Sequence, residues 1–324
     1  MGDIAAGRNF ALQATILAGF LATTLSSADP TIADQYPESV LYAKPVEFIP
    51  GVWSATGATA PPTYDNSGHN NNLSFIVTGE GVVVINSGTS YLLAAALHKE
   101  IKGITGQPVI LVVNENGQGH AMLGNGYWQD QDVTILAHAD AAAEFAERGH
   151  ESLLQMRRYN NEKAEGTSVQ PPTETFTTEK IYEFGRFRIE VKWLGPAHSA
   201  GDIVVWLPNE RLVISGDMAF HERLLPVFED TQTLDWLESW ERFEALGAAY
   251  VIPGHGHPTN MDQVRRYTKD YLMFIRGEVR KLLDEDGDLQ AAYEIDQSAW
   301  SHLHTFDELA KKNAGRVFEQ MEFE

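Results

Sequence analysis

The sequence predicts an α/β fold, a four-layer αββα sandwich in which two β-sheets lie between outer helices, followed by a helical C-terminal extension. Three observations lead to this prediction. Short strand-like runs alternate with helix-like segments, and they do so in two similar halves. The run Val109–Val113 is wholly apolar, as expected of a strand buried on both faces. Polar motifs rich in glycine and histidine follow several strands, where a rigid sheet can hold them.

The chain divides into four regions along its length. After residues 1–28, a polar, proline-rich lead-in spans residues 29–65, the main domain spans 66–260, and a helical extension spans 261–324. The polar stretch 159–178 is expected to be a surface excursion. Strands are expected at residues 46–53, 72–78, 81–86, 109–113, 134–137, 180–184, 187–193, 202–207 and 211–215, and helices at 90–102, 139–148, 234–246, 261–283 and over most of 289–324.

Composition excludes several classes of function. The 324 residues are 43% hydrophobic and 21% charged, which is typical of a globular protein with a sizeable core. The net charge of -21 repels phosphate backbones, so a nucleic-acid partner is not expected. The chain has no cysteine, which excludes disulfides, thiolate nucleophiles and cysteine-ligated zinc. A small-molecule substrate is the expected partner, and the pattern carries no information on oligomeric state.

The first 28 residues contain an apolar segment, residues 10–25, that carries no charge. It is shorter than the roughly 20 residues that span a bilayer comfortably. Small residues around Ala28 fit signal-peptide cleavage. We expect a secretory signal or a membrane anchor, with an N-terminal helix packed on the domain as a third interpretation. The first two imply a periplasmic or secreted protein, membrane-associated through residues 10–25 if anchored, and the third leaves a cytoplasmic location open.

Four dispersed side chains carry the main chemical indication: His120, His198, Asp217 and His255. Each lies in a glycine-containing segment near a predicted strand end, and glycine permits the tight turns that aim such groups. Several imidazoles and one carboxylate, with a position left open, suit a catalytic zinc ion. Such an ion lowers the pKa of its bound water to about 7 and so supplies hydroxide.

The motifs around these residues resemble a known family. GPAHSAGD at 195–202, VISGD at 213–217 and VIPGHG at 251–256 resemble the second half of a metallo-β-lactamase-fold hydrolase, and VVVINSGTS at 82–90 resembles its early strand and turn. The resemblance covers about residues 72–258. The helical tail also resembles the quinoprotein-relay or SoxH-like branch. The resemblance implies a hydrolase that attacks a small ester, lactone, amide or sulfate-type substrate with metal-bound hydroxide.

One hallmark of the family is altered. Its His-x-His-x-Asp-His run aligns here with Asn116-Gly117-Gln118-Gly119-His120-Ala121, so amides replace the two leading histidines. The first metal position of the family would keep only His198, with Gln118 nearby. The second would keep His120, Asp217 and His255. The resemblance therefore implies one ion rather than two, zinc or another divalent metal, with His198 as a fourth ligand or an acid/base group.

The remaining roles follow from what the altered run lacks. The family's usual acid/base aspartate is missing, and Glu115, His198 and His257 are the candidates to replace it. Asn116 and Gln118 are expected to have a structural or substrate-contacting role.

Asp202 is expected either to support the ligands or to cap a turn. The altered run also favours an alternative function, a non-catalytic binding or accessory protein of the same fold with a degenerate metal site. No Gly-x-Ser-x-Gly elbow or phosphate-binding loop is present to support another chemistry.

Overall fold

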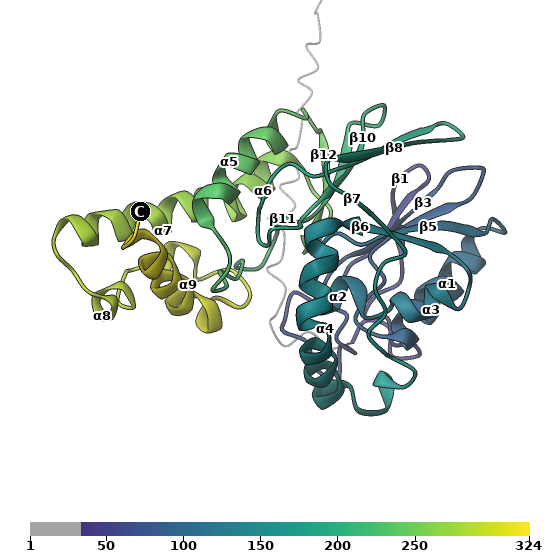
Figure 1. Cartoon of the computed structure of the whole chain (residues 1–324), viewed down its shortest axis with the longest axis horizontal. Coiled ribbons are helices and arrows are strands. Elements are labelled where there is room, and N and C mark those ends of the chain that lie inside the picture. Colours follow the sequence, from purple (N-terminus) through teal and green to yellow (C-terminus); the bar gives the residue numbers. More distant parts are fainter. Residues whose placement is uncertain (1–33) are drawn as a thin grey trace, which may run out of the picture.

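The computed structural model describes residues 34–324 and confirms the predicted fold class. Two mixed β-sheets pack face to face between helices, and a group of C-terminal helices extends to one side (Figure 1). The predicted signal or anchor at residues 1–28 lies outside the described residues. Within residues 34–324, no helix combines the length and apolar character needed to cross a bilayer.

The first sheet has seven strands in the order β1-β2-β3-β4-β5-β6-β7. Strands β1 to β4 pair antiparallel, whereas β4 to β7 pair in parallel. The strands span Val46–Ile49, Val52–Ala55, Leu73–Val77, Val82–Ile85, Val109–Val113, Thr134–His138 and Glu174–Phe176.

The second sheet has five strands in the order β12-β11-β10-β9-β8. Its edge pair β11 and β12 is parallel, and the other pairs are antiparallel. In chain order, β8 to β12 span Glu179–Phe184, Phe187–Lys192, Val204–Leu207, Leu212–Phe220 and Tyr250–His255.

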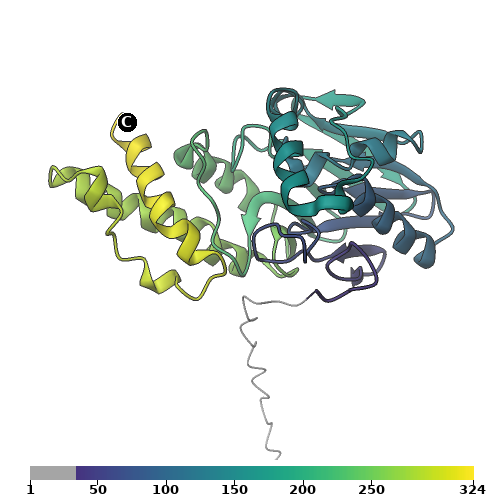
Figure 2. The same cartoon turned by 90° about the horizontal axis from the view of Figure 1, so that it is seen from below.

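Helices cover the outer faces of both sheets. Helices α1, α3 and α4 pack on the first sheet, and α5 and α6 pack on the second. Helices α7 and α9 pack on one another and on the neighbouring helices, to one side of the sheets (Figure 2). The α-helices α1 to α9 span Tyr91–Ile104, Gly119–Met122, Asn125–Gln129, Ala139–Asn160, Thr233–Glu244, Met261–Tyr267, Lys269–Asp284, Leu289–Ala292 and Phe306–Met321, and the 3-10 helices span Asn161–Ala164 and Ser298–Trp300.

The core between the sheets follows from the alternation of side chains along a strand. In β4, Val83 and Ile85 face the second sheet, whereas Val82 and Val84 face the helix side. All four are buried, which explains why this run carries no polar residue. Each such side chain stabilises the fold by roughly 1.5–3 kcal/mol relative to exposure. The result is a rigid scaffold beneath the loops at the strand ends.

Several predicted boundaries were wrong. Residues 46–53 form two strands rather than one, because Gly51 takes a φ of 84° and lets the chain reverse. Helix α4 continues beyond residue 148 to Asn160, since buried residues recur every three or four positions along it. The polar stretch 159–178 includes strand β7 as well as loop.

Two further differences concern the second half of the chain. The helix expected at 261–283 is divided into α6 and α7 at Thr268, whose hydroxyl contacts the backbone of Phe220. Asp217 was expected just after a strand but lies inside β11, which continues past a register shift at Gly216.

Candidate metal centre

Three of the predicted ligands come together where the two sheets meet. His120 lies in α2, just after the loop that follows β5 of the first sheet. Asp217 lies in β11 and His255 ends β12, two neighbouring parallel strands of the second sheet. One ligand atom from each residue can be chosen so that all three lie within 4.8 Å of one another. The sequence-based expectation that these dispersed motifs converge is therefore met by the geometry.

Asp217 is the centre of this group. Its Oδ1 lies 3.2 Å from Nε2 of His255, and its Oδ2 lies 3.5 Å from Nε2 of His120. The side chain of Asp217 is 1% exposed, so its charge depends on these neighbours. Burial opposes ionisation, yet His255 and His120 outweigh it and hold the pKa of Asp217 well below its usual range.

Two glycines allow this close approach. A Cβ at Gly254 would lie 2.3 Å from Asp217 Oδ1, so only glycine leaves room for the carboxylate beside β12. Gly216 has a φ of 51°, and a Cβ there would lie 2.3 Å from a carboxylate oxygen of Glu115. Glycine at these two positions therefore lets the backbone lie directly against the carboxylates of Asp217 and Glu115.

The donor set fits one zinc ion. Zinc binds imidazole nitrogen and carboxylate oxygen at about 2.0–2.2 Å, which places two ligand atoms of a tetrahedral ion about 3.3 Å apart. The carboxylate of Asp217 faces both imidazoles, with Oδ1 3.2 Å from His255 Nε2 and Oδ2 3.5 Å from His120 Nε2, and one ligand atom from each residue can be chosen within 4.8 Å of the others. His120, Asp217 and His255 would therefore hold the ion, and a fourth position would face the pocket.

The tautomer of His255 suits this role. Its Nδ1 lies 2.5 Å from the backbone oxygen of Asn70 and donates to it, which leaves Nε2 free to bind a cation. Arg223 is 7% exposed, and its Nη1 lies 3.3 Å from the same Nδ1. Burial first, and then the Arg223 charge, act against the attraction of Asp217 and lower the pKa of His255.

Sequence reasoning missed both Asn70 and Arg223. Asn70 acts through its backbone, so its side-chain type gave no indication. Arg223 is a single cation followed by the apolar run Leu224–Val227. A charged residue next to a buried segment is unusual, and this could have marked Arg223 as part of a site. Burial lowers the pKa of Arg223 to about 10, and it remains a cation at neutral pH.

His198, predicted as a fourth ligand, lies beside the group of three without joining it. Its Nδ1 is 3.7 Å from Asp217 Oδ2 but accepts a hydrogen bond from Gln118 Nε2 at 2.9 Å. Within residues 34–324, the buried Nε2 of His198 has no hydrogen-bond partner. Burial lowers the pKa of His198 to about 4, so the ring is neutral. Its role as a ligand or acid/base group stays a prediction.

The two amides of the altered run are part of this network. Asn116 donates from Nδ2 to Asp217 Oδ2 at 3.3 Å, and its Oδ1 accepts from the backbone of Gln118 at 3.0 Å. With the Gln118–His198 bond, the amides take the place that imidazole ligands would have in a first metal position. Their geometry fits the structural role expected for them and a single-ion site.

Among the three acid/base candidates, Glu115 makes the shortest contact with the group of His120, Asp217 and His255. Its side chain is 2% exposed, and Oε1 lies 3.2 Å from Nε2 of His120. Asn86, at a φ of 69°, fixes the loop by accepting from the Glu115 backbone at 3.0 Å. Burial raises the pKa of Glu115. Although burial opposes it, the charges of Asp217 and Glu115 raise the pKa of His120.

Two other predicted residues lie outside the group of three. Asp202 is buried, and its Oδ2 accepts from the backbone of Ser199, so it shapes the loop that carries His198. His257 is 59% exposed and pairs with Glu222 at 2.7 Å, and it does not line the pocket beside the site. Their functional roles stay predictions.

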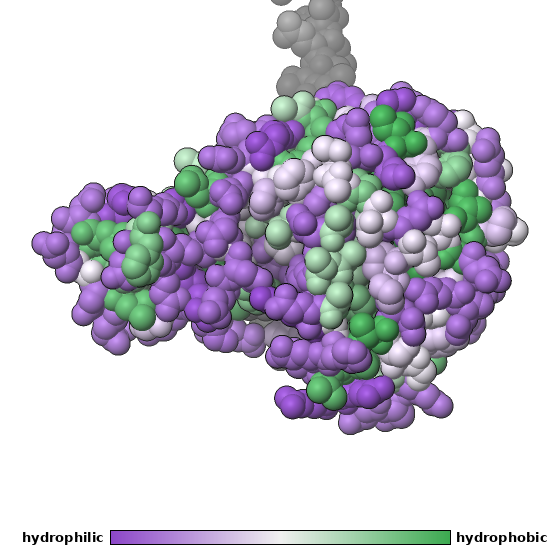
Figure 3. Space-filling view, viewed as in Figure 1, coloured by the Kyte–Doolittle hydropathy of each residue, from purple (hydrophilic) through white to green (hydrophobic). Residues whose placement is uncertain are grey.

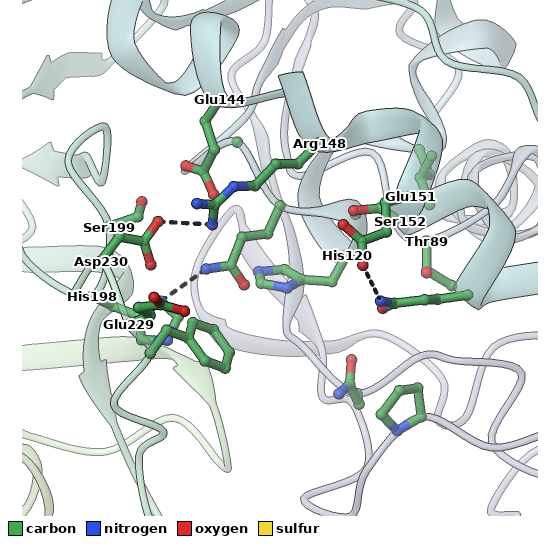
Figure 4. Close-up of a pocket in the computed structure, with 18 of the residues that line it drawn as sticks. Thr89, His120, Glu144, Arg148, Glu151, Ser152, His198, Ser199, Glu229 and Asp230 are labelled. Carbon is green, nitrogen blue, oxygen red and sulfur yellow. Dashed lines mark hydrogen bonds and ion pairs between the residues drawn. The ribbon is translucent and has the colours of Figure 1, made fainter. Parts of the chain in front are cut away.

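A pocket of about 680 Å³ lies beside the candidate metal centre and is lined by His120 and His198. In Figure 4, His198 lies at the left of the pocket beside Glu229 and Asp230, His120 lies near the centre, and Glu144 and Arg148 reach in from α4. Figure 3 shows a recess bordered by hydrophilic residues between α4 and the C-terminal helices. Arg316 of α9 also lines the pocket, so the extension contributes to its wall.

Comparison with known proteins agrees with this geometry. The family model of the metallo-beta-lactamase superfamily matches residues 120–255, which begin and end on two of the three candidate ligands. A metallo-beta-lactamase type 2 from Bacteroides fragilis is 23% identical over 188 residues, 56% of this chain and 70% of the relative.

Two solved structures share the fold. A metallo-beta-lactamase from Pontibacter korlensis has a TM-score of 0.59 at 21% identity, over 71% of this chain and 98% of that one. A stereoselective inverting sec-alkylsulfatase from Pseudomonas sp. has a TM-score of 0.67 at 15% identity, over 87% of this chain and 52% of that one. The second likeness therefore reaches beyond the part of the chain that the first one covers.

Proposed function

We propose that the chain is a metal-dependent hydrolase of the metallo-β-lactamase superfamily, whose family model matches residues 120–255, and that it acts on a small ester, lactone, amide or sulfate-type substrate with one metal ion. The observation that carries this proposal is the convergence of His120, Asp217 and His255 within 4.8 Å beside an open pocket. A zinc ion held there would polarise the substrate and supply hydroxide near neutral pH.

The chain's own residues prepare the site in three ways. The Asn70 carbonyl fixes the ring of His255, and Asn116 fixes the Asp217 carboxylate. Gln118 orients His198 at the side of the pocket. Glu115 Oε1 lies 3.2 Å from Nε2 of His120, so this buried carboxylate would be adjacent to a metal ion held by His120. We assign to Glu115 the role of moving a proton during hydrolysis.

A second candidate function is that of a binding protein of the same fold that carries out no catalysis. It is favoured by the hydrogen bonds of Asn116 and Gln118, which tie down a carboxylate and an imidazole that serve as ligands in a two-ion site. From the helical tail, we also propose that the chain belongs to the quinoprotein-relay or SoxH-like branch of these metallohydrolases.

The test is zinc-dependent hydrolysis of a panel of nitrophenyl esters, lactones, anilides and sulfate esters by the full chain. Asp217→Asn removes the central ligand charge, and we expect it to abolish both turnover and bound zinc. Asp132→Asn is a matched control, because Asp132 is exposed and its φ of 56° is a conformation that asparagine tolerates. Bound zinc without turnover of any panel member would favour the binding protein.

A further inference from the structure

The loop that joins β11 to α5 both lines the pocket and holds His198. Its tip lines the pocket with three residues, Phe228, Glu229 and Asp230. Thr231, which is fully buried, donates from Oγ1 to the backbone carbonyl of His198 at 2.8 Å. The ring of Phe228 lies against that of His198, with the centroids 4.9 Å apart. The loop therefore contacts His198 at its backbone and at its ring.

Thr231 connects these two functions of the loop. While its hydroxyl donates to the carbonyl of His198, it accepts from the backbone N–H of Phe228 at 3.1 Å. A hydroxyl has one hydrogen to donate and lone pairs to accept with, so both bonds form at the same time. The place of the pocket wall and the place of His198 thus depend on one side chain.

Helix α9 holds the loop from the side of the C-terminal extension. Gln320 donates from Nε2 to the backbone carbonyl of Thr231, and its Oε1 accepts from Thr233 Oγ1 at 2.9 Å. Asn313 accepts from the backbone N–H of Val227 at 2.8 Å. These two amides are seven residues apart, about two helical turns, so they lie on one face of α9. The segment that lines the pocket is therefore tied to α9 on both sides.

Between these two ties the tip of the loop is exposed. Phe228 is 45% exposed, and the side chain of Asp230 is 47% exposed where it pairs with Arg148 of α4 at 2.7 Å (Figure 4). Ion pairs this exposed contribute little to stability. The hydrogen bonds to α9 therefore have the larger share in fixing the tip.

The candidate metal ligands are held by other elements. Asn116, which follows β5, donates to Asp217, and the Asn70 carbonyl binds the ring of His255. A change in α9 would thus reach the pocket wall and His198 while these supports of the metal centre remain.

We propose that Gln320 and Thr231 are positioning residues, through which helix α9 determines the place of His198 and of the pocket wall. The connection runs from the Gln320 amide to the Thr231 carbonyl, and from the Thr231 hydroxyl to the His198 carbonyl. The proposal rests on the hydrolase function and deepens it, because it assigns control of substrate binding to the C-terminal extension as well as to the residues beside the metal.

The first test uses the full chain without substrate. Thr231→Val keeps the shape of the side chain and removes the hydroxyl, so the N–H of Phe228 loses its acceptor. By NMR we expect amide exchange at Phe228 to become about tenfold faster and the ring resonances of His198 to shift. Thr231→Ser keeps the hydroxyl and should restore both. If the serine and valine variants behave alike, the hydroxyl does not hold the loop and the proposal is overturned.

Gln320→Met tests the connection to α9 at a distance from the pocket. Methionine has a similar length but makes neither hydrogen bond, so exchange at Phe228 should again accelerate and the His198 resonances should shift in the same direction. Gln290→Met, an exposed change in α8 of the same extension, is the control and should alter neither. Unchanged exchange in Gln320→Met would overturn the proposal. Equal acceleration in the buried strand β5 would also overturn it, because the cause would then be a loss of overall stability.

Kinetics on any ester that the panel identifies as a substrate provide the second readout. In Gln320→Met we expect kcat/KM to fall about tenfold, mainly through KM, and the zinc affinity to stay within about threefold. An unchanged KM, or the loss of zinc, would overturn the proposal. If no member of the panel is hydrolysed, the hydrolase function fails, whereas the exchange and resonance measurements still decide whether α9 positions the loop.

Discussion

Replacing Gly254 with alanine should remove tight metal binding without touching any ligand. A Cβ at this position would lie 2.3 Å from Asp217 Oδ1 and 2.7 Å from the backbone carbon of Gly216. Ordinary van der Waals contact begins at 3.4 Å, so the carboxylate must move by about 1 Å. The backbone of Gly216 cannot relieve the clash, because β11 pairs with β12 at this point.

The expected loss follows from the tolerance of a zinc site. Ligand distances vary by only about 0.2 Å around their ordinary values, so a shift of 1 Å breaks the bond to Asp217. Removing even a group that supports a ligand costs 10–100-fold in metal affinity, and we expect at least about 100-fold for the ligand itself. The overpacked methyl should also lower the free energy of unfolding by about 1–3 kcal/mol.

Competition with a chromophoric chelator measures the zinc affinity, and urea unfolding of the zinc-free protein measures the stability. Gly277→Ala is the control, because Gly277 lies in the exposed face of α7 with no atom within 4 Å of its added Cβ. It should keep the affinity and gain about 1 kcal/mol of stability. If Gly254→Ala binds zinc within threefold of the unaltered protein, the reasoning is refuted.

Three further predictions concern the network and the scaffold. The pair Asn116→His with Gln118→His should raise bound zinc from one ion to two per chain, and a count that stays at one would contradict our interpretation of the amides. Asn313→Leu should lower the free energy of unfolding by about 2–4 kcal/mol, because the buried backbone N–H of Val227 and the carbonyl of Leu225 would lose their hydrogen bonds to Asn313. An unchanged urea midpoint would contradict this prediction. Burial lowers the pKa of His69 to about 4, so the unfolded chain binds the proton first. His69 should therefore contribute a fall in stability of about 1.4 kcal/mol per pH unit as the pH falls from 6.5 to 4, and His69→Gln should remove that contribution from the measured slope.

The sequence could predict the layers and the ligand group, because both depend on local patterns. Apolar alternation identified most strands, and His120, Asp217 and His255 stood in motifs at or near strand ends. Asp217 was predicted to lie just after a strand, whereas it lies within β11. The convergence then follows from the topology, because β11 and β12 are adjacent parallel strands.

The walls of the pocket could not be predicted, because they depend on residues that are distant in the chain. Arg148 pairs with Asp230 only once α4 and the loop after β11 face each other. Arg316 reaches the pocket from the last helix. The helix was predicted to end at residue 148, so Glu151 and Gln155, which line the pocket from the second half of α4, were not assigned to it. These long-range contacts form the pocket wall, and no local motif in the sequence records them.

The measurement that tests the central claim most directly is the metal content of the purified full chain, combined with anomalous diffraction at the zinc edge. We predict one zinc ion per chain, bound by His120, Asp217 and His255, and its loss in His120→Ala with His255→Ala. Two ions per chain, or an anomalous peak between Asn116, Gln118 and His198, would contradict the single-ion site.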